Sequence, residues 1–239
     1  MHNMATPRYE YSRSVIQAAL FDMDGLMFDT ESAYSTVHSV MSQRRGKVFT
    51  NEVKMTLMGK RADEVMGLLN RFWGGGEDVE ILLQEQDKEL IEVYKNSVEK
   101  MDGLDDIIDF LDLHNIRKCI GTSSRRFLVD ILLEKFDLHN SFEFIVTGEM
   151  VEKGKPDPEI YSQCVLKMNL LANQCLVLED SLNGVKSGVS AGCHTCAVPS
   201  KYTEHEDFST ATLVCDSLCD VAIQNFLLSE SDISLETTL

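Results

Sequence analysis

The stretch Gln17-Ala18-Ala19-Leu20-Phe21-Asp22-Met23-Asp24-Gly25 decides the fold, because it is an uncharged run that ends at two acids. Residues 17–21 have the length and apolar character of a buried strand. Burial of an unpaired carboxylate is costly, and two neighbouring carboxylates also repel each other. Asp22 and Asp24 at the end of such a strand therefore indicate a bound cation. Carboxylate oxygens with no nearby His or Cys favour Mg²⁺ over zinc.

Further short apolar runs are expected to form strands at residues 117–120, 142–146, 175–178, 194–198 and 211–215. Helical patterns fall between them, at residues 104–114, 125–136, 158–168 and 182–190. Alternation of strands and helices is typical of a parallel sheet that is covered by helices on both faces. The sequence therefore predicts an α/β fold with a Rossmann-like sheet.

Residues 31–100 interrupt this alternation, since they contain no strand run. Their apolar residues recur at helical spacing: Val37, Val40 and Met41; Val65, Leu68, Leu69 and Phe72; Leu90, Ile91 and Tyr94. Residues 74–76 are three glycines and predict a turn between helices. We expect a small all-helical cap domain at 31–100, a core domain at 15–30 and 101–228, and flexible termini at 1–14 and 229–239. The methionines of this region, Met55, Met58 and Met66, are expected in the helix core.

The composition excludes several classes of partner. With 22 Lys and Arg against 39 Asp and Glu, the net charge is −17, which disfavours nucleic acids and anionic membranes. No apolar run reaches the roughly 18 residues of a membrane span, and residues 1–14 lack the apolar segment of a signal peptide. The seven Cys are odd in number, and most lie in apolar runs. Core packing is favoured for them over a redox or zinc role at Cys193-x-x-Cys196. We expect the protein to be cytoplasmic and monomeric.

Three more polar clusters follow predicted strands, and such positions converge at the carboxyl ends of a parallel sheet. Thr122 and Ser123 lie in Gly121-Thr122-Ser123-Ser124, where hydroxyls and backbone N–H groups suit a phosphate oxygen; Ser124 is expected to be an ordinary helix N-cap. Lys155 directly precedes Pro156-Asp157-Pro158, whose two prolines hold a loop that opens a helix, and it offers a fixed positive charge. Glu179 and Asp180 again place two acids after a buried strand. Together these residues predict a Mg²⁺-dependent phosphoryl-transfer site.

The order Asp22-x-Asp24, Thr122, Lys155 and Glu179-Asp180 resembles the haloacid dehalogenase-like hydrolase superfamily. Its motifs span residues 16–198. The run Phe-Asp-Met-Asp-Gly-Leu-Met-Phe-Asp-Thr-Glu at residues 21–31 resembles the branch that carries a helical cap and includes β-phosphoglucomutase-like proteins and sugar-phosphate phosphatases. The resemblance implies a Mg²⁺-dependent phosphatase that acts on a small phosphomonoester, such as pseudouridine 5′-phosphate or a related nucleotide or sugar phosphate.

The resemblance also implies a role for each core residue. Asp22 is the nucleophile that forms an aspartyl-phosphate, and Asp24 is the general acid and base. Mg²⁺ is held by Asp22, the backbone carbonyl of Asp24 and Asp180, with Glu179 nearby or bound through water. Thr122, Ser123 and Lys155 bind the phosphoryl oxygens.

The cap residues expected near the substrate are Thr30, Glu31, Lys60 and Arg61. Thr30 and Glu31 can hydrogen-bond sugar hydroxyls, while Lys60 or Arg61 can meet a second anionic or carbonyl group.

Departures from the mutase pattern favour a phosphatase. Mutases of this branch carry a His shortly after Asp-Thr, where this chain reads Asp-Thr-Glu-Ser-Ala-Tyr at residues 29–34. His38, one helical turn further on, is expected on the cap surface. The Arg that mutases place after the cap glycine has no clear match in Gly59-Lys60-Arg61. A phosphomutase, a broad-specificity sugar-phosphate phosphatase and a regulatory protein on the same fold remain the alternatives.

Overall fold

A computed structural model describes residues 16–57 and 62–229 of the chain. Its strands are β1 (Ala18–Phe21), β2 (Arg117–Gly121), β3 (Ile145–Val146), β4 (Cys175–Glu179), β5 (His194–Ala197) and β6 (Leu213–Val214). They form one sheet in the order β3-β2-β1-β4-β5-β6, and every neighbouring pair is parallel. This arrangement confirms the predicted α/β fold with a Rossmann-like sheet.

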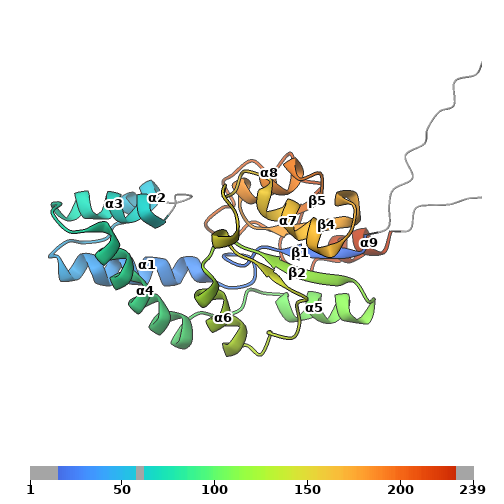
Figure 1. Cartoon of the computed structure of the whole chain (residues 1–239), viewed down its shortest axis with the longest axis horizontal. Coiled ribbons are helices and arrows are strands. Elements are labelled where there is room, and N and C mark those ends of the chain that lie inside the picture. The colour runs from blue at the N-terminus through green and yellow to red at the C-terminus, as the bar shows by residue number, and fades with distance from the viewer. Residues whose placement is uncertain (1–15, 58–61, 230–239) are drawn as a thin grey trace, which may run out of the picture.

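The helices divide into two groups along the chain (Figure 1). The first group is α1 (Thr30–Arg44), α2 (Asn51–Leu57), α3 (Ala62–Trp73) and α4 (Val79–Asn96). The second group alternates with the strands and comprises α5 (Leu104–Leu113), α6 (Arg126–Lys135), α7 (Glu159–Met168), α8 (Leu182–Ser190) and α9 (Val221–Leu228). Short 3-10 turns at Gly148–Met150 and Ala172–Gln174 precede α7 and β4.

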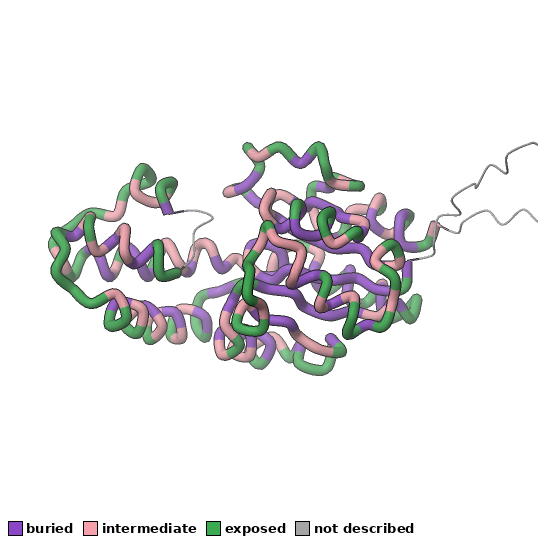
Figure 2. The backbone as a smooth tube through the Cα atoms, turned by 45° about the horizontal axis from the view of Figure 1, so that its top comes forward, coloured by how far each residue is buried: buried purple, intermediate pink, exposed green. Residues whose placement is uncertain are grey.

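Side chains that alternate along the strands build a core on each face of the sheet. On β1, Ala18 and Leu20 pack on the side of α7, while Ala19 and Phe21 pack on the opposite side with α5, α6 and α9. The central strands β1 and β4 are therefore buried along their length, whereas Val214 of the edge strand β6 is exposed (Figure 2). Two covered faces explain why these strands read as continuous apolar runs.

Helices α1 to α4 lie beside the sheet rather than on it (Figure 1). Two antiparallel links join them to the sheet layer, since Asp29 N donates to Glu99 O and Met101 N donates to Met27 O. Buried side chains of α1, α3 and α4 are continuous with the core on the α5 and α6 side. The predicted boundary near residues 30 and 100 falls at these two links, and the division into domains stays a prediction.

Several local expectations need correction. Residues 142–146 form a strand only at Ile145–Val146, and the apolar spacing did not predict α2 or α9. His38 is buried, not on the surface, because its Nε2 lies 2.9 Å from Gln86 Oε1 between α1 and α4. Met55 is 58% exposed, whereas Met66 is buried as expected.

The cysteines behave as predicted for core residues. Cys119, Cys164, Cys175, Cys193, Cys196 and Cys215 are buried, and Cys219 is exposed. Cys193 and Cys196 belong to different hydrophobic clusters, and both are buried.

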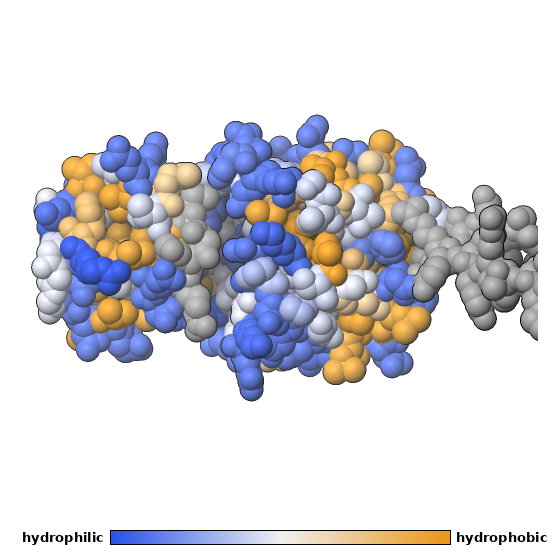
Figure 3. All heavy atoms as spheres, turned by 90° about the horizontal axis from the view of Figure 1, so that it is seen from above, coloured by the Kyte–Doolittle hydropathy of each residue, from blue (hydrophilic) through white to orange (hydrophobic). Residues whose placement is uncertain are grey.

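The surface seen in Figure 3 mixes hydrophilic and hydrophobic residues over both the helical group and the sheet layer. Within the described ranges, no helix combines the length and the apolar character that a membrane crossing needs.

Candidate active site

The sheet topology brings the predicted motifs to one edge. β1 lies between β2 and β4, where the strand order changes direction, and ligands of open α/β sheets bind outside the carboxyl ends of the strands at this point. Asp22 directly follows β1, Thr122 directly follows β2, and Glu179 ends β4. Lys155 reaches the same place from the loop before α7, although it lies 133 residues from Asp22 in sequence.

Lys155 is the hub of this cluster. Its Nζ donates to Asp22 Oδ1 at 2.5 Å and to Glu179 Oε1 at 2.6 Å, and also to the Gly121 carbonyl at 3.0 Å. The Tyr161 hydroxyl lies 2.9 Å from this nitrogen and donates to Glu179 Oε1 at 2.7 Å. The ammonium group therefore has a fixed position beside the Asp22 carboxylate.

Burial and charge oppose each other in this cluster. Burial alone would lower the pKa of Lys155, but the carboxylates of Asp22 and Glu179 outweigh it and raise that pKa above its ordinary value. Burial raises the pKa of Asp22 well above its ordinary range, and although Lys155 opposes the shift, Glu179 and Asp24 add to it. Lys155 therefore stays charged, whereas the carboxylates lack sufficient positive charge around them.

A divalent cation fits this imbalance. Asp22, Glu179 and Asp180 are all buried, and one carboxylate oxygen from each lies within 4.8 Å of the others. Three carboxylates face the single ammonium of Lys155, and burial together with Glu179 and Asp22 raises the pKa of Asp180. An all-oxygen donor set without His or Cys suits Mg²⁺. The Asp24 side chain is not part of this trio. Coordination of Mg²⁺ by the backbone carbonyl of Asp24 remains a prediction.

Ser200, Thr203 and Gly25 surround Asp180. Ser200 Oγ donates to Asp180 Oδ2 at 3.4 Å, and Thr203 Oγ1 donates to the Asp180 carbonyl at 2.7 Å. Gly25 lies against the same carboxylate with φ +81°, and a Cβ at this position would lie 2.3 Å from Asp180 Oδ2. Only glycine fits here, since both the backbone conformation and the space exclude a side chain.

Asp24 is held by the loop after β2. Its Oδ2 accepts hydrogen bonds from Thr122 Oγ1 at 3.0 Å and from Ser124 Oγ at 2.7 Å. Ser124 therefore positions a predicted catalytic carboxylate, and the expectation of an ordinary N-cap was wrong, because Arg125 holds that position of α6. Ser123 lies in the same loop and is exposed.

Tyr161 and Ser124 are site residues that sequence reasoning missed. Ser124 stood beside the predicted Thr122, so its place in the loop was a usable signal. Nothing in the sequence distinguished Tyr161 from other apolar residues of α7, because its hydroxyl is brought to Glu179 by packing.

The cap-side residues are placed in part. Thr30 is fully buried at the start of α1. Glu31 is half-buried beside it, and burial raises its pKa while Lys54 of α2 opposes the shift and Asp24 adds to it. Thr30 and Glu31 thus lie on the Asp24 side of the cluster. Lys60 and Arg61 lie outside the described residues.

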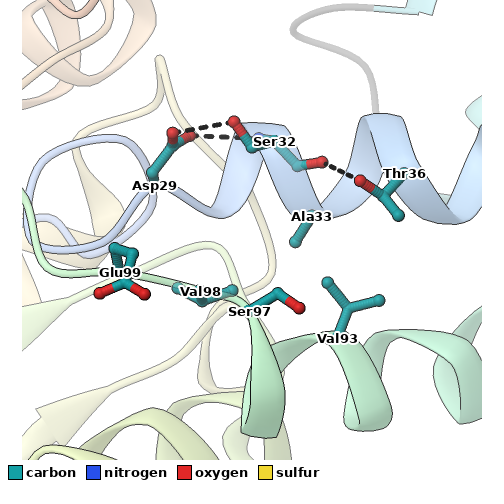
Figure 4. A pocket seen from close by; sticks show the side chains of 8 residues that line it. All are labelled: Asp29, Ser32, Ala33, Thr36, Val93, Ser97, Val98 and Glu99. Carbon is teal, nitrogen blue, oxygen red and sulfur yellow. Dashed lines mark hydrogen bonds between the residues drawn. The ribbon is translucent and has the colours of Figure 1, made fainter.

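One cavity lies close to this site without belonging to it. It has a volume of about 210 Å³ and lies between the start of α1 and the end of α4 (Figure 4). Asp29, Ser32, Val93 and Glu99 are among its lining residues, and none of the predicted catalytic residues lines it. The Asp29 carboxylate is the N-cap of α1, and it accepts hydrogen bonds from the backbone N–H and the hydroxyl of Ser32. The cavity therefore lies beside the link between Asp29 and Glu99, where the helical group joins the sheet layer.

Comparison with known proteins identifies relatives over most of the chain. The chain resembles the phosphorylated carbohydrates phosphatase of Thermotoga maritima, with 28% identity over 177 residues that cover 74% of this chain and 82% of the relative. A Drosophila melanogaster relative named "Probable pseudouridine-5'-phosphatase" is 29% identical over 216 residues, which cover 87% of this chain and 92% of the relative.

A solved structure shows the same fold. CbbY from Rhodobacter sphaeroides in complex with phosphate superposes with a TM-score of 0.77 at 24% identity, covering 86% of this chain and 96% of that one. The model of the haloacid dehalogenase-like hydrolase family matches residues 19–198, which contain Asp22, Thr122, Lys155 and Asp180. The chain therefore belongs to the haloacid dehalogenase-like hydrolases, and it is a phosphoric monoester hydrolase.

Proposed function

We propose that this enzyme is a Mg²⁺-dependent phosphatase that hydrolyses a small sugar or nucleotide phosphate through an aspartyl-phosphate. The observation that carries the proposal is the contact of Lys155 Nζ with Asp22 Oδ1 and Glu179 Oε1 beside a trio of buried carboxylates. A cluster of this kind fits a dianionic phosphoryl group, because fixed positive charge must balance the nucleophile and the transferring oxygens.

Asp22 acts as the nucleophile in this proposal. A carboxylate oxygen of Asp22 attacks phosphorus, the ester P–O bond breaks, and the leaving oxygen takes a proton from Asp24. Water then attacks the same phosphorus and gives a proton to Asp24, which releases inorganic phosphate and the free Asp22 carboxylate. Ser124 keeps Asp24 in place through both steps, since its hydroxyl donates to Asp24 Oδ2. The Thr122 hydroxyl makes the same contact without substrate and turns to a phosphoryl oxygen when substrate binds.

The charges around phosphorus come from two sources. Lys155 faces the phosphoryl oxygens together with the Thr122 hydroxyl and the Ser123 loop. Mg²⁺ would be held by Asp22, Asp180 and the Asp24 carbonyl, with Glu179 close by, and would supply positive charge that offsets the repulsion between substrate and carboxylates.

Helices α1 to α4 are proposed to be the cap that selects the leaving group. Thr30 and Glu31 lie at the start of α1 and can hydrogen-bond hydroxyls of a sugar. Lys60 and Arg61 are proposed to meet a carbonyl or a second anionic group. The two relatives described above are named as phosphatases of phosphorylated carbohydrates and of pseudouridine 5′-phosphate. The similarity of this chain to them makes pseudouridine 5′-phosphate the first candidate substrate.

The test measures phosphate release with Mg²⁺ from pseudouridine 5′-phosphate, uridine 5′-phosphate, glucose 6-phosphate and glycerol 3-phosphate. We expect at least tenfold higher kcat/KM for pseudouridine 5′-phosphate, which corresponds to about 1.4 kcal/mol of discrimination. Equal hydrolysis of the hexose phosphate would replace this assignment with a broad-specificity phosphatase. Isomerised phosphate esters in place of free phosphate would identify a mutase.

Asp22→Asn tests the covalent step, because an amide does not attack phosphorus. We expect less than about one hundredth of the wild-type turnover, given the size of nucleophile losses elsewhere. Thermal unfolding of the variant is the control for its fold, and substantial turnover by a folded variant would remove the aspartyl-phosphate from the proposal.

A further inference from the structure

Three buried side-chain oxygens lack a hydrogen-bond partner within residues 16–57 and 62–229: Asp24 Oδ1, Thr30 Oγ1 and Tyr94 Oη. A buried polar atom without a partner is unfavourable, and in native proteins it usually has an explanation such as a ligand or a bound water. Asp24 and Thr30 already belong to the proposed site. Tyr94 has no role in it so far, although its side chain is fully buried.

Contacts between α4 and α6 bring the face of α4 that carries Tyr94 close to the loop after β2. Ser124 binds Asp24, and the next residue, Arg125, forms an ion pair with Asp87 of α4, with Arg125 Nη1 2.7 Å from Asp87 Oδ2. Tyr94 follows Asp87 by two helical turns and therefore lies on the same face of α4. Lys135 of α6 fixes the end of that helix, because its Nζ donates to the Val98 carbonyl at 2.5 Å.

Electrostatics agrees with this placement. Burial raises the pKa of Tyr94 well above its ordinary value, and Tyr34, Asp24 and Glu31 raise it further. Tyr34 lies one turn after Thr30 on α1, and burial and Asp24 raise its pKa as well. The Tyr34 hydroxyl is near enough to affect Tyr94, yet Tyr94 Oη has no partner of normal hydrogen-bond geometry. Tyr34, Asp24 and Glu31 are therefore near enough to act electrostatically on the Tyr94 hydroxyl.

The chemistry of this group fits an uncharged, hydroxyl-bearing partner. Phenol and threonine hydroxyls donate and accept hydrogen bonds, as sugar hydroxyls do. The carboxylates of Asp24 and Glu31 disfavour an anion at the same place, and Arg125 is already paired with Asp87.

We propose that Tyr94 is a specificity-determining residue whose phenol hydroxyl binds a neutral sugar hydroxyl of the leaving group. This inference rests on the proposed phosphatase function and deepens it, since it assigns the hydrogen bond that recognises the sugar to a residue in the last turn of α4. Thr30 and Tyr34 complete the hydroxyl-binding group.

In this proposal, substrate reaches Tyr94 only after α1 and α4 move relative to the sheet, because Tyr94 is fully buried. Asp24 Oδ1 is as thoroughly buried as Tyr94 Oη, and in the proposed reaction Asp24 has to meet the leaving oxygen. Both atoms therefore become accessible in the same event, when α1 and α4 shift relative to the sheet. The two links at Asp29–Glu99 and Met27–Met101 are the points about which this shift would occur.

Tyr94→Phe isolates the hydroxyl, because it removes one unpartnered oxygen and keeps the buried ring. The probes are the fastest wild-type substrate among pseudouridine 5′-phosphate, uridine 5′-phosphate and glucose 6-phosphate, and p-nitrophenyl phosphate, whose leaving group has no sugar hydroxyl. We expect kcat/KM to fall at least tenfold for the hydroxylated ester and to stay within about twofold for p-nitrophenyl phosphate. The melting temperature should change little, since the buried ring is kept and Tyr94 Oη has no hydrogen bond of normal geometry.

Tyr202→Phe is the matched control. It removes the same atom from a tyrosine whose hydroxyl is paired with Ser32 Oγ at 2.9 Å, and it should leave the ratio of the two substrates unchanged. Equal kcat/KM changes for both esters in Tyr94→Phe, or no change in either, would overturn the assignment. A wild-type enzyme that hydrolyses neither ester would instead refute the proposed function, so the two failures are distinguishable.

Discussion

Replacement of Gly25 by alanine should disable the active site through Asp180, without touching a catalytic group directly. A Cβ at Gly25 would lie 2.3 Å from Asp180 Oδ2 and 2.8 Å from its Cγ, while Cβ atoms in proteins essentially never approach another heavy atom closer than 3.0 Å. The carboxylate must therefore move by at least 0.7 Å, the difference between 2.3 Å and 3.0 Å. That movement would disturb the contact of Ser200 Oγ with Asp180 Oδ2, while Thr203 holds the Asp180 backbone through its carbonyl.

Two effects then follow, and they differ in size. The left-handed backbone at Gly25 costs an alanine about 1–2 kcal/mol of stability. Displacement of a predicted metal ligand by most of an ångström should reduce kcat by about 10- to 100-fold, since misplacement by about 1 Å commonly costs about 100-fold. The concentration of Mg²⁺ needed for half-maximal activity should rise as well.

Gly46→Ala is the control for the backbone effect. Gly46 also has a left-handed conformation, with φ +67°, but a Cβ there meets nothing within 4 Å. Phosphate release at several Mg²⁺ concentrations and thermal unfolding should be measured for both variants. We expect similar losses of stability and a loss of activity in Gly25→Ala alone. Normal kcat and normal Mg²⁺ dependence in a folded Gly25→Ala would refute the argument that Asp180 holds the metal in this position.

Two further predictions concern the metal and the general acid. EDTA should abolish activity and Mg²⁺ should restore it, while saturating Mg²⁺ should raise the melting temperature because it offsets the repulsion among the three buried carboxylates; full activity in EDTA would exclude a metal requirement. Asp24→Asn should reduce kcat less for p-nitrophenyl phosphate than for a sugar phosphate, since p-nitrophenolate needs little protonation to leave; equal losses for both esters, measured by phosphate release, would point to a structural role for Asp24.

Much of the fold could be predicted from the sequence because its sheet is buried on both faces. Such strands are continuous apolar runs, and the polar residues that stop them, such as Asp22 and Glu179, mark their carboxyl ends. The prediction of strands was less accurate where apolar residues are buried outside the sheet. In the run at 142–146, Phe142 packs against Phe21 in the core without being part of a strand. Only the last two residues of the run belong to the ladder with β2.

The helical region shows the same limit more clearly. Helical spacing identified α1, α3 and α4, but it did not show which side of α1 faces α4. His38 was therefore expected at the surface, although the neighbouring helix supplies Gln86 and removes both side chains from water.

By itself, the sequence determined the order of the motifs and thus the residue types available for catalysis: Asp22, Asp24, Thr122, Lys155 and the Glu179-Asp180 pair. Their chemistry follows from side-chain type and from position after a strand, and both are local properties. Tertiary structure decided the partners. Tyr161 on Glu179, Ser124 on Asp24 and the unpartnered Tyr94 hydroxyl beside them depend on how helices far apart in sequence pack, and that packing is set by the whole core rather than by any short stretch.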